Sequence, residues 1–169
     1  MPSTVDFIRQ QGFTAEGCED GLFAALMFQP RVVAAVVIVS AVLQSPWLFL
    51  ALSIVLWWGA LVPQRNPFDV VVNHAMTRRG RLAVMPAAPA PRRFSQAMAG
   101  SFAVSIAIAL LAGAVRLAWL LEGIFAVASM SVVVRRFCLP AYVYALLWPG
   151  TRPTPCPQTF AVTRLPVKL

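Results

Sequence analysis

Charged side chains are scarce in this chain, and acidic ones are the scarcest. Aspartate and glutamate together number 6 among 169 residues, and charged residues make up 12% of the sequence. A soluble domain carries about twice that charged fraction, because its surface must be solvated. The low charge therefore argues against a soluble domain and favours a membrane protein.

Histidine and cysteine are also rare, with one His and three Cys. A structural zinc site needs four ligands in closely spaced pairs, and His74, Cys18, Cys138 and Cys156 form no such pair. The sequence contains no glycine-rich phosphate loop, nucleophile elbow or catalytic pair of carboxylates. We therefore expect no metal, no cofactor and no enzyme activity. His74 could bind a haem or pigment through a ring nitrogen, although a solvated side chain is the simpler interpretation.

Long apolar runs fill much of the chain, which is 59% hydrophobic. They predict four transmembrane helices in two hairpins, at about residues 32–43, 47–62, 97–115 and 117–134. The first two runs are shorter than the roughly 20 residues that cross a bilayer. Either the first helix begins near Leu22 and bends at Pro30, or the bilayer thins locally. We favour an interfacial segment over residues 22–28 followed by a short span.

The expected fold is an all-α membrane protein in three parts. Residues 1–29 form a cytoplasmic or interfacial segment without the basic start and apolar stretch of a signal peptide. Residues 30–148 form the four-helix domain, with an inner loop at 63–96. Residues 149–169 form a cytoplasmic tail whose prolines prevent a continuous helix.

Positive charge is distributed unevenly between the two sides of this arrangement. Of the 14 Lys and Arg residues, Arg116 alone lies on one side and the other thirteen lie opposite. The positive-inside rule then places both termini and the inner loop in the cytoplasm. The net charge of +8 does not indicate nucleic acid, because these cations lie at the ends of apolar runs. We expect membrane lipids and other membrane-protein subunits as partners.

The inner loop has two parts with different patterns. Asn66 and Pro67 begin a stretch of apolar residues at helical spacing, with Asp69 on the polar face, which predicts a short amphipathic helix on the inner membrane surface. Residues 85–91 predict an extended, polyproline-like strip that acts as a stiff spacer or a docking surface. The candidate partner contacts in this loop are Arg78, Arg79, Arg81, Pro86, Pro89, Pro91, Arg92 and Arg93.

Four short motifs stand at the ends of the apolar runs: PRV at 30–32, NPF at 66–68, APRRFSQ at 90–96 and FCLPA at 137–141. The third resembles the Pro-Arg-Phe-x-Gln signature that opens the second hairpin in a family of small bacterial integral-membrane proteins of unknown function. The first two resemble the segments that enter and leave that family's first hairpin. The fourth is similar to the family's Phe-Cys-Leu-Gly-Cys-Glu motif after the last span.

The family motif implies thiol or sulfur chemistry through its two cysteines, but Ala141 takes the place of the second one here and Pro140 that of the glycine. Cys138 therefore cannot form the internal disulfide of that pair. Arg135 and Arg136 lie next to it and would favour a reactive thiolate, whereas a small side chain filling the interface is the alternative. All three cysteines are expected to be reduced, as in other cytoplasmic segments.

Small residues recur every four positions in the third apolar run. In a bilayer such a row lets two helices approach closely, either within this chain or between subunits. The residues of the row are Ala97, Ser101, Ser105, Ala109 and Gly113.

Glu122 is an acidic residue near the outer end of the fourth run. Its shallow depth favours an interfacial anchor close to Arg116 and the helix N-terminus. A subunit contact, or the handling of protons or ions, is the alternative.

These features predict a non-catalytic accessory or scaffold subunit of a larger membrane complex. An electron-transfer assembly, respiratory or photosynthetic, is one host that would fit. A membrane partner in thiol or sulfur transfer through Cys138 is the first alternative. A small oligomeric transporter is the second, since two Pro-Arg openings before apolar hairpins suggest a duplicated unit.

Overall fold

The computed structural model describes residues 3–15, 19–78 and 85–156. This part of the chain is helical and has no strand; one isolated bridge joins Phe13 to Thr154. The elements are α1 (Thr4–Gln10), α2 (Glu19–Val42), α3 (Pro46–Leu61), the 3₁₀ turn η1 (Pro63–Arg65), α4 (Pro67–Arg78), α5 (Ala90–Leu111), α6 (Val115–Arg135) and α7 (Leu139–Leu147).

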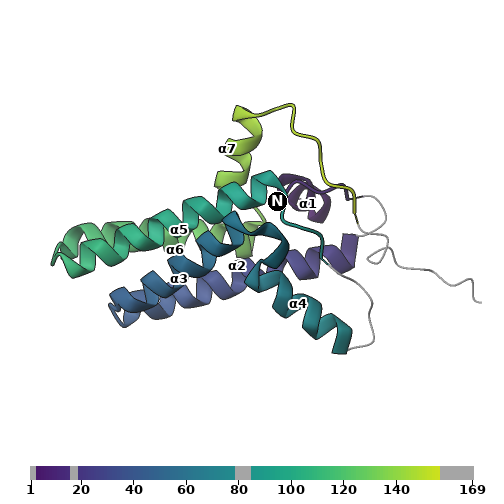
Figure 1. The fold of residues 1–169 in the computed structure, drawn as a ribbon. Helices are drawn as coiled ribbons and strands as arrows, with labels where there is room; N and C mark the ends of the chain where they lie inside the picture. Colours follow the sequence, from purple (N-terminus) through teal and green to yellow (C-terminus); the bar gives the residue numbers. More distant parts are fainter. Residues whose placement is uncertain (1–2, 16–18, 79–84, 157–169) are drawn as a thin grey trace, which may run out of the picture.

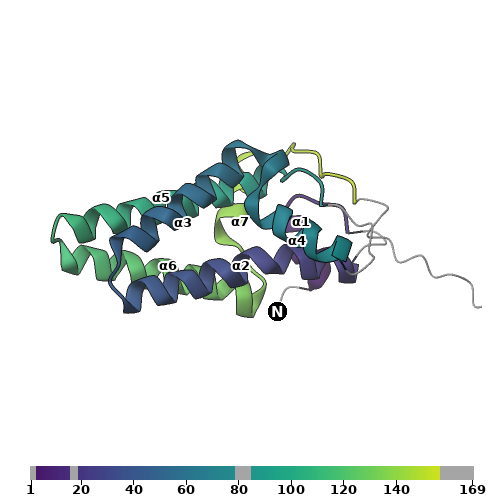
Figure 2. The ribbon, with the colours of Figure 1, turned by 60° about the horizontal axis from the view of Figure 1, so that its bottom comes forward.

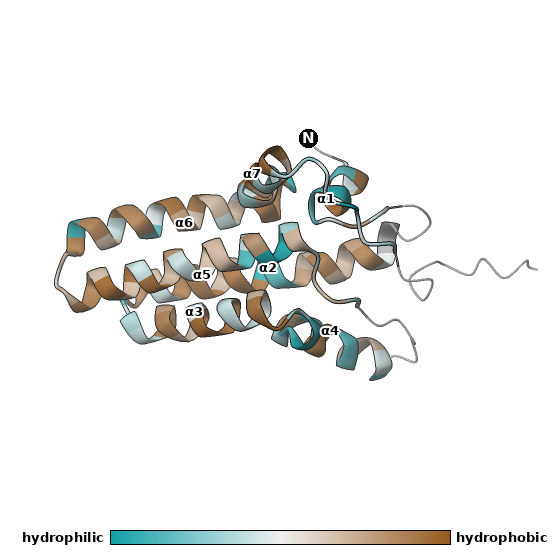
Figure 3. Cartoon of the chain, turned by 45° about the horizontal axis from the view of Figure 1, so that its top comes forward, coloured by the Kyte–Doolittle hydropathy of each residue, from teal (hydrophilic) through white to brown (hydrophobic). Residues whose placement is uncertain are grey.

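Four helices, α2, α3, α5 and α6, lie lengthwise beside one another (Figures 1 and 2). Two tight turns close one end of the bundle, which we call the turn end. The opposite end, which we call the basic end, carries α1, α4 and α7. Hydrophobic residues follow the four helices, and hydrophilic ones gather at α1, α4 and the first turn of α5 (Figure 3).

Three of these helices are long and apolar enough to cross a membrane. They are the part of α2 from Gly21 to Val42, which has 22 residues, α5 with 22 and α6 with 21. At about 1.5 Å per residue each exceeds the roughly 30 Å of a hydrocarbon core. The fourth helix, α3, is apolar but has 16 residues. The prediction of an all-α chain with helices fit for a membrane is therefore confirmed.

The first helix does not break where the sequence suggested. α2 runs without interruption through Pro30, so the expected segment at 22–28 and the expected first span form one continuous helix. Proline lacks the N–H that would bond one turn back, but it does not have to end a helix whose faces are packed on both sides of it. The expected alternative, a helix beginning near Leu22, is closer to the observed start at Glu19.

The two halves of α2 belong to different hydrophobic clusters. Leu22, Leu26 and Met27 join the N-terminal cluster, in which they pack with buried residues of α1 and α4. Val33 and Val37 join the bundle cluster, which contains buried residues of α3, α5 and α6. The expected polar N-terminal segment is thus a packed unit attached to the bundle.

The chain segments at 12–15 and 154–156 also join at the basic end. The amide of Thr14 donates to the carbonyl of Thr154, and the amide of Thr154 donates to the carbonyl of Gly12. The amide of Cys156 donates to the hydroxyl of Thr14. The beginning of the predicted tail is therefore held on the protein, and residues 157–169 lie outside the described part.

α3 and α5 make the closest helix packing of the bundle. The indole of Trp57 lies against Gly100, whose carbonyl accepts a hydrogen bond of 2.9 Å from Ser53. The buried face of α5 runs through Gln96, Gly100, Ala103 and Ala107.

Most of the buried face of α5 therefore lies outside the row of small residues that the sequence indicated, of which Ala109 is buried. Ser105 and Gly113 of that row are exposed, and Gly113 lies in the turn after α5. Ser101 and Ser105 donate to carbonyls of their own helix, which satisfies their hydroxyls without a neighbouring helix. The row remains a candidate for contact with another subunit.

Gly100→Ala should destabilise the bundle. A Cβ at this position would lie 2.7 Å from Cδ1 of Trp57, so the indole would have to move. We expect a loss of about 1–3 kcal/mol in the free energy of unfolding, measured in detergent micelles. Gly123→Ala is the matched control, since no atom lies within 4 Å of its Cβ position. Equal stability of the two variants would contradict the packing described.

Candidate functional site

A buried ion pair joins α4 to α5 at the basic end of the bundle. The guanidinium of Arg92 donates to both carboxylate oxygens of Asp69, at 3.0 and 2.6 Å. The side chains are 4% and 8% exposed, respectively. The pair is bidentate, which is the strongest arrangement of these two groups.

Two glutamines complete what we call the polar layer, which consists of Gln29, Asp69, Arg92 and Gln96. The amide oxygen of Gln29 accepts a hydrogen bond from Arg92 and another from Gln96, both of 2.9 Å. The layer thus ties α2, α4 and α5 together. A buried charge is tolerated only when paired and hydrogen-bonded, and this layer meets both conditions for Arg92.

The polar layer lies between the two hydrophobic clusters. In α4, Phe68 belongs to the bundle cluster and Val72 to the N-terminal cluster, and Asp69 lies between them in sequence. The prediction that Asp69 sits on the polar face of this helix is wrong, although the helix itself is as expected. The spacing of Asp69 to Val72 and Met76 already places all three on one helical face, which is the signal that could have revealed it.

The four sequence motifs meet around this layer. The first follows Gln29 directly, the second precedes Asp69, and the third contains Arg92 and Gln96. The fourth reaches the third through a hydrogen bond of 3.4 Å from the Cys138 thiol to the Ser95 hydroxyl. Segments far apart in the chain therefore build one site.

A glycine allows the layer to approach α3. A Cβ at Gly59 would lie 3.0 Å from the amide oxygen of Gln96 and 3.1 Å from the amide nitrogen of Asn66. Neither of these two atoms has a hydrogen-bond partner among the described residues. The amide oxygen of Asn66 accepts from the backbone of Phe68 at 3.1 Å, which orients the start of α4.

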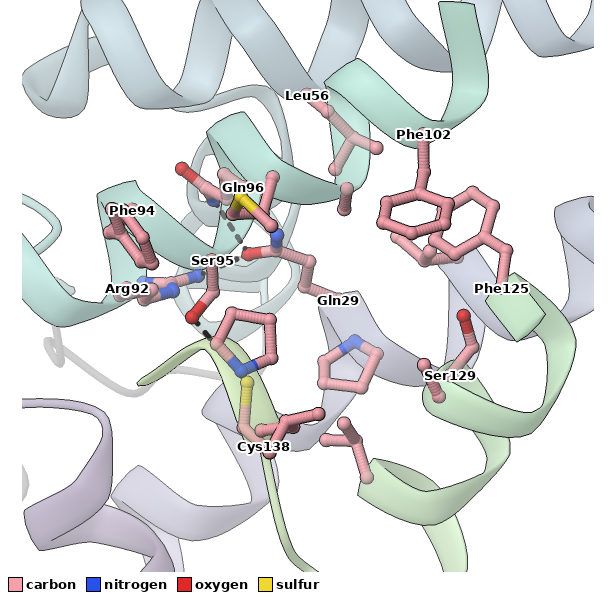
Figure 4. A pocket seen from close by; sticks show the side chains of 18 of the residues that line it. Gln29, Leu56, Arg92, Phe94, Ser95, Gln96, Phe102, Phe125, Ser129 and Cys138 are labelled. Carbon is pink, nitrogen blue, oxygen red and sulfur yellow. Dashed lines mark hydrogen bonds between the residues drawn. The ribbon is translucent and has the colours of Figure 1, made fainter. Parts of the chain in front are cut away.

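A cavity of about 280 Å³ lies beside the polar layer, and side chains of α2, α5, α6 and α7 supply most of its lining (Figure 4). Phe102 and Phe125 pack with their ring centroids 6.0 Å apart and form part of an apolar wall. The polar side chains in the lining are Gln11, Gln29, Arg92, Ser95, Gln96, Ser129 and Cys138. The position and lining of this cavity make it the candidate site, since ligand pockets are typically apolar with a few placed polar groups.

Cys138 faces this cavity from the residue before α7, a helix that the sequence did not predict. It is a free thiol, 7% exposed. Of the neighbouring arginines, Arg135 is exposed, and Arg136 stacks on Phe23 at 5.0 Å from the ring centroid.

The expectation of reduced cysteines holds for Cys138 and is wrong for Cys156, which is disulfide-bonded. Cys18 lies outside the described residues.

Glu122 does not line this cavity and lies toward the turn end of α6. One carboxylate oxygen accepts a hydrogen bond of 2.9 Å from Gln44, whose own amide oxygen accepts one of 3.1 Å from Trp119. The other carboxylate oxygen is buried without a partner among the described residues. These bonds tie the turn after α2 to α6, which agrees with an anchoring role.

The partner-contact candidates divide into buried and exposed groups. Pro89, Pro91 and Arg92 are buried within the chain, so they offer no surface to a partner. Residues 85–89 are extended but packed on the protein. The amide of Met85 donates to the side-chain oxygen of Asn73, and the amide of Ala88 donates to the carbonyl of Pro63.

Arg78 and Arg93 are exposed and Pro86 is half-buried, whereas Arg79 and Arg81 lie outside the described residues. His74 is exposed on α4 and does not line the cavity. Within the described ranges, no cluster of three His, Cys, Asp or Glu side chains could hold a metal ion.

Arg92→Met should unfold the basic end, because it leaves the carboxylate of Asp69 buried without its cation. We expect a loss of about 3–5 kcal/mol in unfolding free energy in detergent micelles. The double variant Arg92→Met/Asp69→Leu removes both charges and should recover most of that loss. A double variant no more stable than the single one would show that the pair does not carry the stability of this region.

Comparisons with known proteins agree with the motif resemblance. No match was found among curated proteins or among solved structures. A family model described as "Domain of unknown function (DUF4395)" matches residues 24–148. The match contains nearly all of α2 and the whole of α3 to α7, and with them the polar layer and most of the cavity lining. The chain thus belongs to the DUF4395 family of domains of unknown function.

Proposed function

We propose that this protein is a membrane-embedded binding subunit: its bundle holds a small lipid-soluble molecule in the cavity, and it serves a larger membrane assembly without catalysing a reaction itself. The observation that carries this proposal is the preformed cavity beside the polar layer. A cavity lined by Phe102, Phe125, Val33 and Leu56 favours an apolar molecule over a polar metabolite.

Exposed side chains at the edge of the cavity support access from the lipid. Met98, Ile124, Leu139 and Val143 line the cavity and are also exposed on the protein surface. These residues are apolar, so the opening that they surround suits a bilayer rather than water. A molecule dissolved in the membrane could enter between α5, α6 and α7 without crossing an aqueous phase.

The proposed topology has four spans in two hairpins, with α3 as the fourth, in a bacterial inner membrane with both termini on the cytoplasmic side. The disulfide of Cys156 is unusual for that side, since disulfides are rare in the cytoplasm. At about 1.5 Å per residue α3 reaches about 24 Å, which local thinning of the bilayer can accommodate. Support comes from the charges, because Arg65, Arg92 and Arg135 adjoin the basic ends of α3, α5 and α6, whereas Arg116 adjoins the turn end. Arg31 lies within α2.

The proposal that the protein is part of a larger assembly rests on exposed apolar surfaces of α5 and α6. Trp119, Leu120 and Val127 of α6 are exposed, and so is Ser105 of α5. Lipid alone can cover such a surface, and a helix of another subunit can pack there through the small residues. An electron-transfer complex remains one proposed host.

Thiol or sulfur transfer is the second candidate function, and one observation favours it: Cys138 is a free thiol in the lining of the cavity. Trapping a partner protein in a mixed disulfide with Cys138 would replace the binding proposal with this one. The transporter alternative would be revived by solute flux that depends on Glu122.

A lipid-soluble compound should co-purify with the protein. We expect organic extracts of protein purified in mild detergent to contain one compound in near-stoichiometric amount, identified by mass spectrometry. Ala128→Phe should abolish its recovery, because Ala128 lines the cavity and the larger ring would fill it. Val127→Phe, one residue away on the exposed face, is the matched control. Equal recovery from both variants would refute binding in this cavity.

Cys138 should react with a lipid-soluble maleimide and not with a charged, membrane-impermeant one. The physical reason is that its thiol is 7% exposed and faces a cavity whose edge is apolar. Labelling of protein in nanodiscs, located by mass spectrometry, measures both rates, and Cys138→Ser identifies the labelled site. Equal rates with the two reagents would mean that the cavity opens to water.

A further inference from the structure

We infer that the cavity takes the ring of a neutral quinone-type carbonyl compound, whose apolar tail remains in the lipid. This inference rests on the proposed function, that the cavity holds a lipid-soluble molecule, and it names the chemical class. Four properties of the site lead to it: the size, the aromatic wall, an unused hydroxyl and the neutralised charges.

The size of the cavity suits a ring. Its volume of about 280 Å³ is just below the roughly 300–1,000 Å³ found for small-molecule sites. The rings of Phe102 and Phe125 are tilted by 35° with centroids 6.0 Å apart, and both line the cavity. An aromatic wall of this kind favours a flat, unsaturated ligand, because ring faces attract one another in offset arrangements.

A hydroxyl in the lining is free to donate. Ser129 is 8% exposed, and its side chain makes no hydrogen bond to any described residue. A carbonyl oxygen of the ligand would accept a hydrogen bond from this hydroxyl. The Ser95–Cys138 pair also faces the cavity (Figure 4), but its protons are already donated, from Cys138 to Ser95 and from Ser95 to the carbonyl of Pro91. Gln29 of α2 lines the cavity as well, and its amide nitrogen donates to no described residue. Donors on α6 and α2 suit a ring that carries more than one carbonyl group.

The charges of the site indicate a neutral ligand. Both terminal nitrogens of Arg92 are bound, one to Asp69 and the other to Asp69 and Gln29. The carboxylate of Asp69 is paired by the same contacts. A fatty-acid carboxylate or a lipid phosphate would therefore find no unpaired cation in the lining and would lose its solvation.

The exposed edge of the cavity leaves a path for the apolar tail of the ligand. Ile124 and Met98 line the cavity and are also exposed on α6 and α5. A substituent of the ring that passes between them would reach the hydrocarbon region. Figure 4 shows the aromatic pair on the side of the cavity formed by α5 and α6.

The test compares two probes of nearly the same shape, duroquinone and durene. Duroquinone is the fully methylated benzoquinone, whose ring carries no hydrogen for a thiol to replace. Durene is the tetramethylbenzene without the two carbonyl oxygens. Binding to the full chain in lipid nanodiscs is measured by equilibrium dialysis of each labelled probe, with empty nanodiscs as the blank.

We expect saturable binding of duroquinone at least tenfold tighter than that of durene. Ser129→Ala should lower the affinity for duroquinone by about two- to tenfold, as expected for the loss of one hydrogen bond, and should leave the affinity for durene unchanged. Ala128→Phe should abolish binding of both probes, and Val127→Phe should leave both as in the wild type.

Equal affinities for the two probes would overturn the carbonyl assignment while leaving a cavity that binds apolar molecules. Failure of both probes to bind the wild type would overturn this inference and the proposed function together. Duroquinone binding that is insensitive to Ala128→Phe would overturn the assignment of the site.

Discussion

The bidentate ion pair between Arg92 and Asp69 is the constraint on which the basic end of this protein depends. It fixes the start of α4 to the start of α5, and through Gln29 it fixes both to the middle of α2. Since both charges are buried, neither can move away from the other without a large loss of free energy. The position of α4 and the basic-end edge of the cavity follow from this one contact.

The polar layer also determines what the neighbouring cavity can bind. Its donors and acceptors are largely satisfied by one another, so the cavity lies beside two full charges and yet presents no free one. The remaining polar groups in its lining are the amide of Gln11, the hydroxyls of Ser95 and Ser129 and the thiol of Cys138. A site of this composition inside a bilayer favours neutral, lipid-soluble molecules, which is the basis of the proposed function.

The sequence predicted the helical class and the positions of most helices, because apolar runs and their breaks are local signals. The predictions failed where contacts between residues far apart in the chain determine the structure. α2 continues through Pro30 because its two halves pack into different clusters, and Asp69 is buried because Arg92, 23 residues away in the chain, pairs with it. The sequence analysis found the four motifs but not the cavity or α7. The motifs come together at one site only in the folded chain, and no single motif reveals that arrangement.

The most direct test of the account is an experimentally determined density map of the protein in lipid nanodiscs, at a resolution that shows side chains. The account predicts density for one ring-sized molecule between Phe102, Phe125 and Ser129, extending past Ile124 toward the lipid, with Arg92 and Asp69 paired beside it. A cavity that holds only water, or one closed by the two phenylalanine rings, would contradict it.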